Sequence, residues 1–208
     1  MIVTLKYDTL LPKTKNVKKG IYFTMNETLK NIAERYTCRD FKSTPLNEQQ
    51  IEALVSAALA APSAMNLQPW HVIMVTDKSI IDEMDLEGME ILKNAEDKSG
   101  YDRMMSRGGK MFYNAPSMAL VFSDGSSWGT FDCGILCQNV VIAAQSMGLG
   151  TCIVGMAGVP LGGPKADEYK KRLGFPEGHT FAVGILVGEI NSGKDPHEHD
   201  LSKVSYVR

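Results

Sequence analysis

Two arginines and a hydroxyl lie close together in the segment RYTCRDF, residues 35–41. Arg35, Thr37 and Arg39 fall within five residues, in a turn expected just past a helix. Arginine offers a planar fork of N–H donors and threonine adds a neutral donor, so the three side chains could converge on one phosphate. The alternative is that Arg35 complements the negative end of its helix and that Arg39 is a solvated surface charge.

An amide-rich loop between two hydrophobic elements is the second candidate site. The stretch APSAMNLQPWHVIMV, residues 61–75, joins the end of a helix, a polar loop and a buried strand. The polar groups of such a loop must be satisfied by water, by protein or by a ligand. Ser63 and Ala64 are small enough for a flat ring to approach the backbone, and Asn66 and Gln68 supply donors and acceptors. The loop suits a heteroaromatic ring with alternating donors and acceptors, although a helix-stopping proline, a polar turn and a core tryptophan would give the same pattern.

Two glycine-rich stretches fail as nucleotide-binding motifs. SMGLGTCIVG, residues 146–155, has the spacing GxGxxxxG, and it follows a helix and precedes a strand, which reverses the Rossmann order. GVPLGGPK, residues 158–165, is no P-loop because Pro164 separates Gly163 from Lys165. A classical NAD-binding fold is therefore not expected, and no catalytic triad or metal-ligand spacing stands out.

The hydrophobic patterns predict helices and strands that alternate in one mixed α and β domain. Helices are expected from residue 26 up to the RYTCRDF segment and over residues 47–62, 77–95, 132–147 and 164–173, with strands over 71–76, 117–123, 151–155 and 181–190. Asn26 is a candidate N-cap, and Asn47 with Gln50 a candidate capping box. The helix 132–147 is apolar almost all round, which predicts a central, buried position.

Glycines and prolines set three further expectations. Gly148 and Gly150 are expected to end the central helix, and Pro164 is expected to be the first residue of a surface helix that stops before Gly174. The segment 100–110, with paired methionines and paired glycines, is expected to be mobile and is the candidate lid.

Composition indicates a soluble, cytoplasmic globular protein. The 208 residues are 44% hydrophobic and 22% charged with a formal net charge of −2, so neither nucleic acid nor an anionic membrane is an expected partner. No cysteine pair has CxxC spacing, which favours small buried thiols in a reducing compartment over a zinc or redox site. His197 and His199 in the polar tail are expected to be solvated. Residues 1–25 carry five lysines and one aspartate and form the predicted arm, unless Met25 is the native start.

Four segments together resemble the FMN-dependent nitroreductase family in order and spacing. They are RYTCRDF, APSAMNLQPWHVIMV, NAPSMALVF and DCGILCQNVVIAAQSMGLGTCIVG, and the resemblance runs from about residue 26 to the C-terminus, the predicted domain 26–208. It implies an α+β fold, a central, mostly antiparallel sheet flanked by helices with a buried central helix, in an intimate homodimer. FMN would lie at the interface between the two chains.

The resemblance also implies which residues hold the cofactor. Those implied at the phosphate are Arg35, Tyr36 through its backbone, Thr37 and Arg39, with Lys194 the first choice and Arg208 the second for a further basic contact. Those implied at the flavin ring are Pro62, Ser63, Ala64, Met65, Asn66 and Gln68, with the backbone of Ile153, Val154 and Gly155 at the other face or edge. Tyr36 stands where the family often has arginine or histidine and Thr37 where serine is usual, but threonine keeps the hydroxyl.

The implied activity is ping-pong hydride transfer, in which NAD(P)H reduces FMN and a flat acceptor such as a nitroaromatic or quinone then oxidises it. No side chain is then needed as a general acid or base. Two alternatives remain open: the same fold with specialised flavin chemistry, such as reductive dehalogenation or flavin turnover, and a flavin-binding protein with little turnover.

Overall fold

The computed structural model describes residues 26–207, and these residues fall into two compact units. The first unit holds the described residues up to Tyr36 together with the chain from Lys194 onward, and the second runs from Thr37 to Gly193. The predicted arm, residues 1–25, and Arg208 lie outside the described residues.

The described residues of the first unit include one helix and one short turn of 3₁₀ helix. Helix α1 (Glu27–Glu34) begins where expected, because the Asn26 side chain accepts a hydrogen bond of 3.0 Å from the backbone N–H of Leu29. The chain becomes extended at Arg35, and η2 (Leu201–Lys203) lies in the tail.

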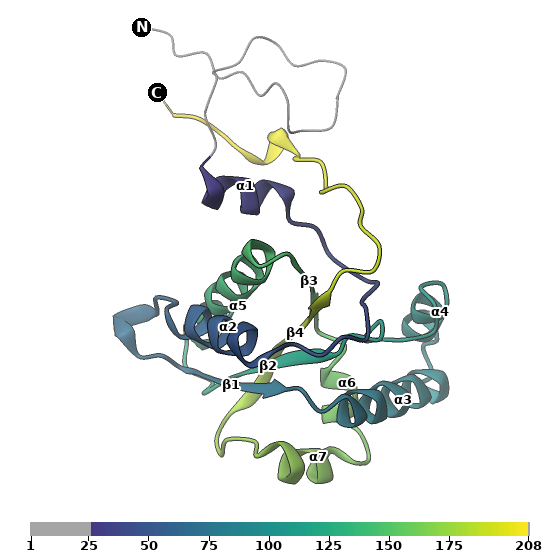
Figure 1. The fold of residues 1–208 in the computed structure, drawn as a ribbon. Coiled ribbons are helices and arrows are strands. Elements are labelled where there is room, and N and C mark those ends of the chain that lie inside the picture. Colours follow the sequence, from purple (N-terminus) through teal and green to yellow (C-terminus); the bar gives the residue numbers. More distant parts are fainter. Residues whose placement is uncertain (1–25, 208) are drawn as a thin grey trace, which may run out of the picture. The chain divides into compact units, whose positions relative to one another are not determined.

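A four-stranded antiparallel sheet organises the second unit, with strand order β1-β2-β4-β3 (Figure 1). Its strands are β1 (Trp70–Val75), β2 (Ser117–Ser123), β3 (Leu149–Val154) and β4 (Thr180–Glu189). All seven residues of β2 are buried, as its central place and its run of apolar side chains require. The predicted α+β class with an antiparallel sheet is confirmed.

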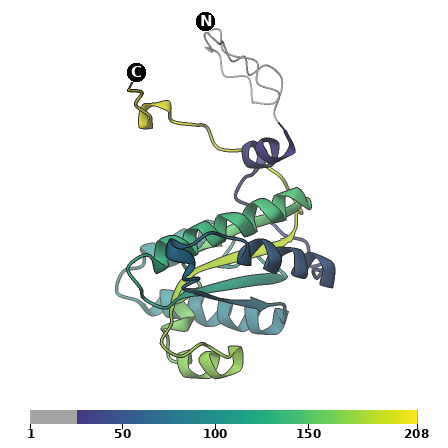
Figure 2. The same cartoon turned by 90° about the vertical axis from the view of Figure 1, so that its left-hand side faces the viewer.

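Helices cover both faces of this sheet (Figure 2). On one face lie α2 (Glu48–Leu59) and α5 (Gly129–Ser146), and on the other lie α3 (Lys78–Asn94), α6 (Gly158–Leu161) and α7 (Ala166–Leu173), with α4 (Ser99–Met105) following α3. Helix α5 contacts all four strands, and its inward side chains join those of α2 and the sheet in the main hydrophobic core. The predicted buried central helix is confirmed, and so is the capping box of Asn47 and Gln50 at the start of α2.

Several predicted boundaries were wrong for local reasons. Helix α2 ends at Leu59, before the proline, and α5 begins three residues earlier than expected. Gly150 does not end α5 but lies within β3. Pro164 is not helical, because the N–H of Ala166 bonds to the carbonyl of Gly163 in a turn (3.0 Å) and α7 starts only there. The candidate lid contains helix α4, and its mobility stays a prediction.

Gly150 lets the chain around Cys38 pack closely against β3. A Cβ on residue 150 would lie 2.8 Å from the Cβ and Sγ atoms of Cys38 and 2.9 Å from Cγ1 of Ile190. We expect Gly150→Ala to lower the free energy of unfolding by about 1 to 3 kcal/mol, because these atoms belong to a packed interior and must move. The matched control is Gly162→Ala, where the new Cβ meets only ordinary contact at 3.4 Å. Urea unfolding of both variants measures the difference, and equal stabilities would contradict the expectation.

Candidate functional site

The segment that contains Thr37 and Arg39 lies along the outer edge of β3. Thr37 forms a parallel bridge with Thr151, and the N–H of Cys38 donates to the carbonyl of Thr151 at 2.8 Å. The N–H of Lys42 donates to the carbonyl of Glu189 at 2.9 Å, so the segment is held at both ends. Cys38 is buried while Thr37 is half-buried and Arg39 exposed, as alternation along an extended chain requires. Thr37 and Arg39 therefore point to the same side, with polar groups available for an anion.

Asp40 ties this segment to the turn after β4. Its carboxylate accepts hydrogen bonds from the Ser192 hydroxyl (2.6 Å) and from the side-chain amide of Asn191 (3.1 Å to each oxygen). The backbone N–H of Asn191 also donates to the backbone carbonyl of Asp40 (3.0 Å). The Ser192 hydroxyl and then the Asn191 amide hold the pKa of Asp40 below its ordinary value. The carboxylate thus stays ionised at neutral pH and keeps its bonds to the side chains of Ser192 and Asn191.

Three of the residues predicted to bind the phosphate belong to the first unit, not to the unit that contains the sheet. Arg35, Tyr36 and Lys194 lie in the first unit, whereas Thr37 and Arg39 lie in the second. Their convergence on one anion stays a prediction.

The loop before β1 is held in an unusual backbone conformation. Met65, Asn66 and Gln68 all have positive φ angles, of 50°, 55° and 48°. The Ser63 hydroxyl accepts from the N–H of Gln68 at 2.9 Å, and the N–H of Asn66 donates to the Ser63 carbonyl at 3.0 Å. Non-glycine residues in this region cost free energy and persist where the surroundings hold them, often at ligand sites.

Asp132 anchors this loop to the first turn of α5, a role that the sequence pattern did not reveal. Its side chain is 2% exposed, and Oδ2 accepts the N–H of Ala64 at 3.1 Å. An acid at the start of an otherwise apolar helix was the available signal. The anchored loop exposes the side chain of Met65, which is 86% accessible, together with the amides of Asn66 and Gln68.

The end of β3 offers backbone groups and an apolar side chain. Because the Thr151 carbonyl points away from β4, the alternation of a strand places the N–H and C=O of Ile153 at the same open edge. The Ile153 side chain is 48% exposed, and Gly155 is exposed with no atom within 4 Å of the place where a Cβ would stand. Val154 contributes only backbone, because its side chain is buried.

The sheet order places these two groups of residues at opposite edges. The loop 63–68 leads into β1 and the segment 37–42 borders β3, with β2 and β4 between them. Three strand spacings separate the edges by about 14 Å, and α5 fills the face of the sheet between them. Within one copy of the unit, the loop and the segment therefore lie on opposite sides of the sheet's two central strands.

Ion pairs and buried thiols elsewhere in the second unit have structural roles. Lys165 and Arg172 pair with Glu83, which joins α7 to α3. Burial raises the pKa of both Cys133 and Cys137 to about 11, so these two thiols stay protonated at neutral pH. All four cysteines of the chain are buried thiols.

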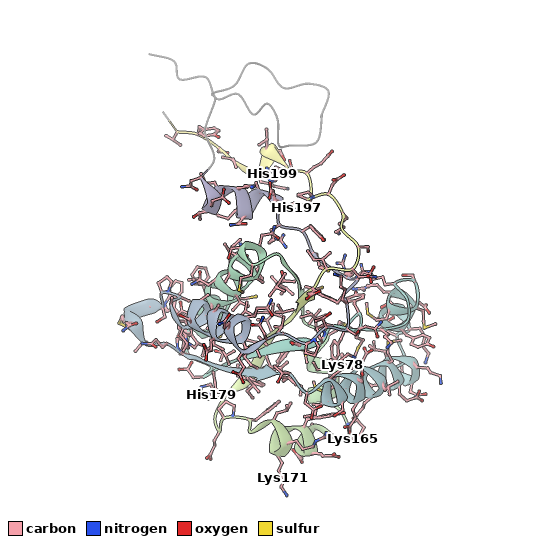
Figure 3. All side chains as sticks on the ribbon, in the orientation of Figure 1. Lys78, Lys165, Lys171, His179, His197 and His199 are labelled. Carbon is pink, nitrogen blue, oxygen red and sulfur yellow. The ribbon has the colours of Figure 1, made fainter. Side chains whose placement is uncertain are left out.

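The two histidines of the tail lie apart from these polar groups in the sequence. His197 and His199 are both exposed, with ring centroids 5.7 Å apart (Figure 3). Within residues 26–207, no three His, Cys, Asp or Glu side chains are grouped so that they could hold a metal ion. The same residues include no helix with the length and apolar content to cross a bilayer.

Comparisons with known proteins identify the class. The model of the nitroreductase family matches residues 32–189, so the chain belongs to the nitroreductase family. It is 46% identical to a nitroreductase with bound FMN from Desulfitobacterium hafniense, with a TM-score of 0.85 over 89% of this chain and 100% of that one. The predicted family and fold are confirmed.

The chain is also similar, at lower identity, to proteins with other names. The FMN reductase (NADPH) of Bacillus subtilis is 28% identical over 183 residues, which cover 83% of this chain and 70% of the relative. An iodotyrosine deiodinase bound to FMN and 3-iodo-L-tyrosine is 21% identical with a TM-score of 0.64, over 87% of this chain and 97% of that one. This last likeness shows a shared fold alone.

Proposed function

We propose that this protein is an FMN-dependent oxidoreductase that takes hydride from NADH or NADPH and passes it to a flat acceptor such as a nitroaromatic or a quinone. The observation that carries the proposal is the 46% identity with an FMN-bound nitroreductase over that whole chain. The buried thiols and the family membership support work in a reducing cytoplasm.

The described residues fit the cofactor. Thr37 and Arg39 offer a hydroxyl and a guanidinium on one side of an extended segment, which suits a phosphate. The loop 63–68 presents amides beside small residues, and the open edge at Ile153 presents backbone groups, which suits the polar rim of a flavin ring. When bound, FMN supplies the redox chemistry. The chain's own work is to bind the phosphate, orient the ring and exclude water from one face of it.

We propose further that two copies of the chain build each site. The loop and the segment lie at opposite edges of one sheet, and a flavin held between two copies would contact the loop of one copy and the segment of the other. The outer surface of α5 supports this arrangement. Trp128 and Phe131 are 60% and 64% exposed, and their rings form an edge-to-face pair at 5.9 Å. Phe131 also lines a shallow depression together with Thr130, Gly134 and Gln138. Exposed aromatic side chains on a helix that is apolar almost all round are typical of a subunit interface.

Phe131→Asp is expected to convert the proposed dimer to monomers. Each chain would bring one carboxylate to the interface, and both charges would be buried against apolar surface. Sedimentation velocity measures the change. The matched control is Leu86→Asp, which places the same charge at a 73% exposed apolar position on α3 and should leave the dimer intact. A wild-type protein that sediments as a monomer would contradict the shared site, and so would a Phe131→Asp variant that stays dimeric.

Steady-state kinetics test the proposed reaction. With FMN-loaded protein, double-reciprocal plots of NADPH or NADH oxidation at several quinone concentrations should give parallel lines, because reductant and acceptor use the same space in turn. Intersecting lines would contradict the ping-pong scheme. Oxidation of neither nucleotide by loaded protein would favour a flavin-binding protein with little turnover.

A further inference from the structure

Tyr113, from the segment between α4 and β2, lies against the guanidinium of Arg39. The Cζ atom of Arg39 is 5.9 Å from the centroid of the Tyr113 ring, within the range at which a cation is attracted to the face of an aromatic ring. The ring is 7% exposed, whereas Arg39 is exposed. A buried ring thus supports a charged side chain that reaches solvent.

The residues before Tyr113 are fixed from the side of α3. The carboxylate of Asp85, itself 6% exposed, accepts the backbone N–H groups of Met111 at 2.7 Å and of Phe112 at 3.2 Å. Buried hydrogen bonds to a carboxylate are strong and directional. The position of Tyr113 is therefore set by the packed interior of the unit.

The backbone at Tyr113 is itself strained. Tyr113 and Asn114 have φ angles of 49° and 59°. Asparagine tolerates this left-handed region, but for a bulky residue such as tyrosine it is a clear outlier. Strained conformations of this kind persist where surrounding structure imposes them and cluster at ligand sites.

We propose that Tyr113 is a positioning residue that holds Arg39 ready to bind the phosphate of FMN. The inference rests on the proposed function, in which Arg39 contacts that phosphate. An unrestrained arginine loses side-chain freedom when it binds, and a supported one loses less. The ring attracts the cation without using its N–H groups as hydrogen-bond donors, so they remain available to the anion.

The test compares FMN binding to apoprotein by quenching of flavin fluorescence. Tyr113→Leu should raise the Kd about 2- to 30-fold, whereas Tyr113→Phe, which keeps the ring, should leave it within about twofold. In an Arg39→Ala background Tyr113→Leu should have almost no effect, because the partner of the ring is gone. An equal loss in both backgrounds would show a merely structural role and overturn the proposal.

If Tyr113→Leu does not fold, a second measurement uses substitutions at position 113 that preserve the shape of the ring. Phenylalanine analogues with increasing numbers of ring fluorines at position 113 keep the shape of the ring and weaken its attraction for a cation. The Kd for FMN should rise with each added fluorine, and a flat series would overturn the proposal. Wild-type protein that binds no FMN would overturn the proposed function together with this inference, whereas tight wild-type binding without coupling would overturn this inference alone.

Discussion

Replacing Arg39 by alanine is expected to weaken FMN binding by about 10- to 150-fold. The expectation follows from the proposed contact between this guanidinium and the phosphate, because one such charged hydrogen bond contributes about 1.5 to 3 kcal/mol. Arg39 is exposed and extends from a segment that is held at both ends, so its removal should leave the fold intact. Titration of apoprotein with FMN, followed by flavin fluorescence, gives the Kd.

Two controls separate the specific contact from net charge. Arg39→Lys keeps the charge but loses the planar fork of donors, and should recover only part of the affinity. Lys171→Ala removes one positive charge from a side chain that points away from α7 (Figure 3), and should leave FMN binding unchanged. An affinity of Arg39→Ala equal to that of the wild type would remove Arg39 from the phosphate site.

Replacing Asp85 by alanine is expected to lower the free energy of unfolding by about 2 to 4 kcal/mol. The variant leaves the N–H groups of Met111 and Phe112 without their acceptor, and both residues are almost fully buried. Each buried donor without a partner costs about 1 to 3 kcal/mol, and part of the total is offset because a buried charge is removed as well. Urea unfolding measures the loss, and an unchanged midpoint would contradict this account.

The control Asp85→Asn keeps an oxygen that can accept both bonds and removes the charge. Burial raises the pKa of Asp85 above its ordinary value of 3.8, only partly opposed by the N–H groups of Met111 and Phe112. The folded protein therefore binds this proton more tightly than the unfolded chain, so the contribution of Asp85 to stability falls as pH rises from about 4 through the raised pKa. The stability of Asp85→Asn relative to the wild type should rise over the same window. A constant difference across pH would contradict the assigned shift.

Local patterns in the sequence were sufficient to predict the main helices and strands. The strand at 117–123 was predicted with its observed bounds because seven residues of one buried run lie between clear turn signals. The caps at Asn26 and Asn47 were predicted because each bond links residues three apart. The short helix α6 was missed, because its four residues are too few for a helical period.

The contacts that build the candidate site join residues far apart in the chain, which explains why they were missed. Asp132 bonds to a loop 68 residues earlier, and Asp85 holds backbone groups 26 and 27 residues later. The sequence also predicted the two groups of cofactor residues without showing where each lies. The strand order shows that they occupy opposite edges of the sheet, and the proposal of a site shared by two chains starts from that order.

An absorbance spectrum of the purified protein, followed by anaerobic addition of NADPH or NADH, tests the central claim most directly. The account predicts flavin bands near ~370 and ~450 nm that bleach when the nucleotide is added, because the flavin then accepts its hydride. A protein that is colourless and does not bind added FMN would contradict the account, and the loop 63–68 would then be a structural turn. Bound flavin that neither nucleotide bleaches would contradict the proposed reductase activity while leaving the cofactor site in place.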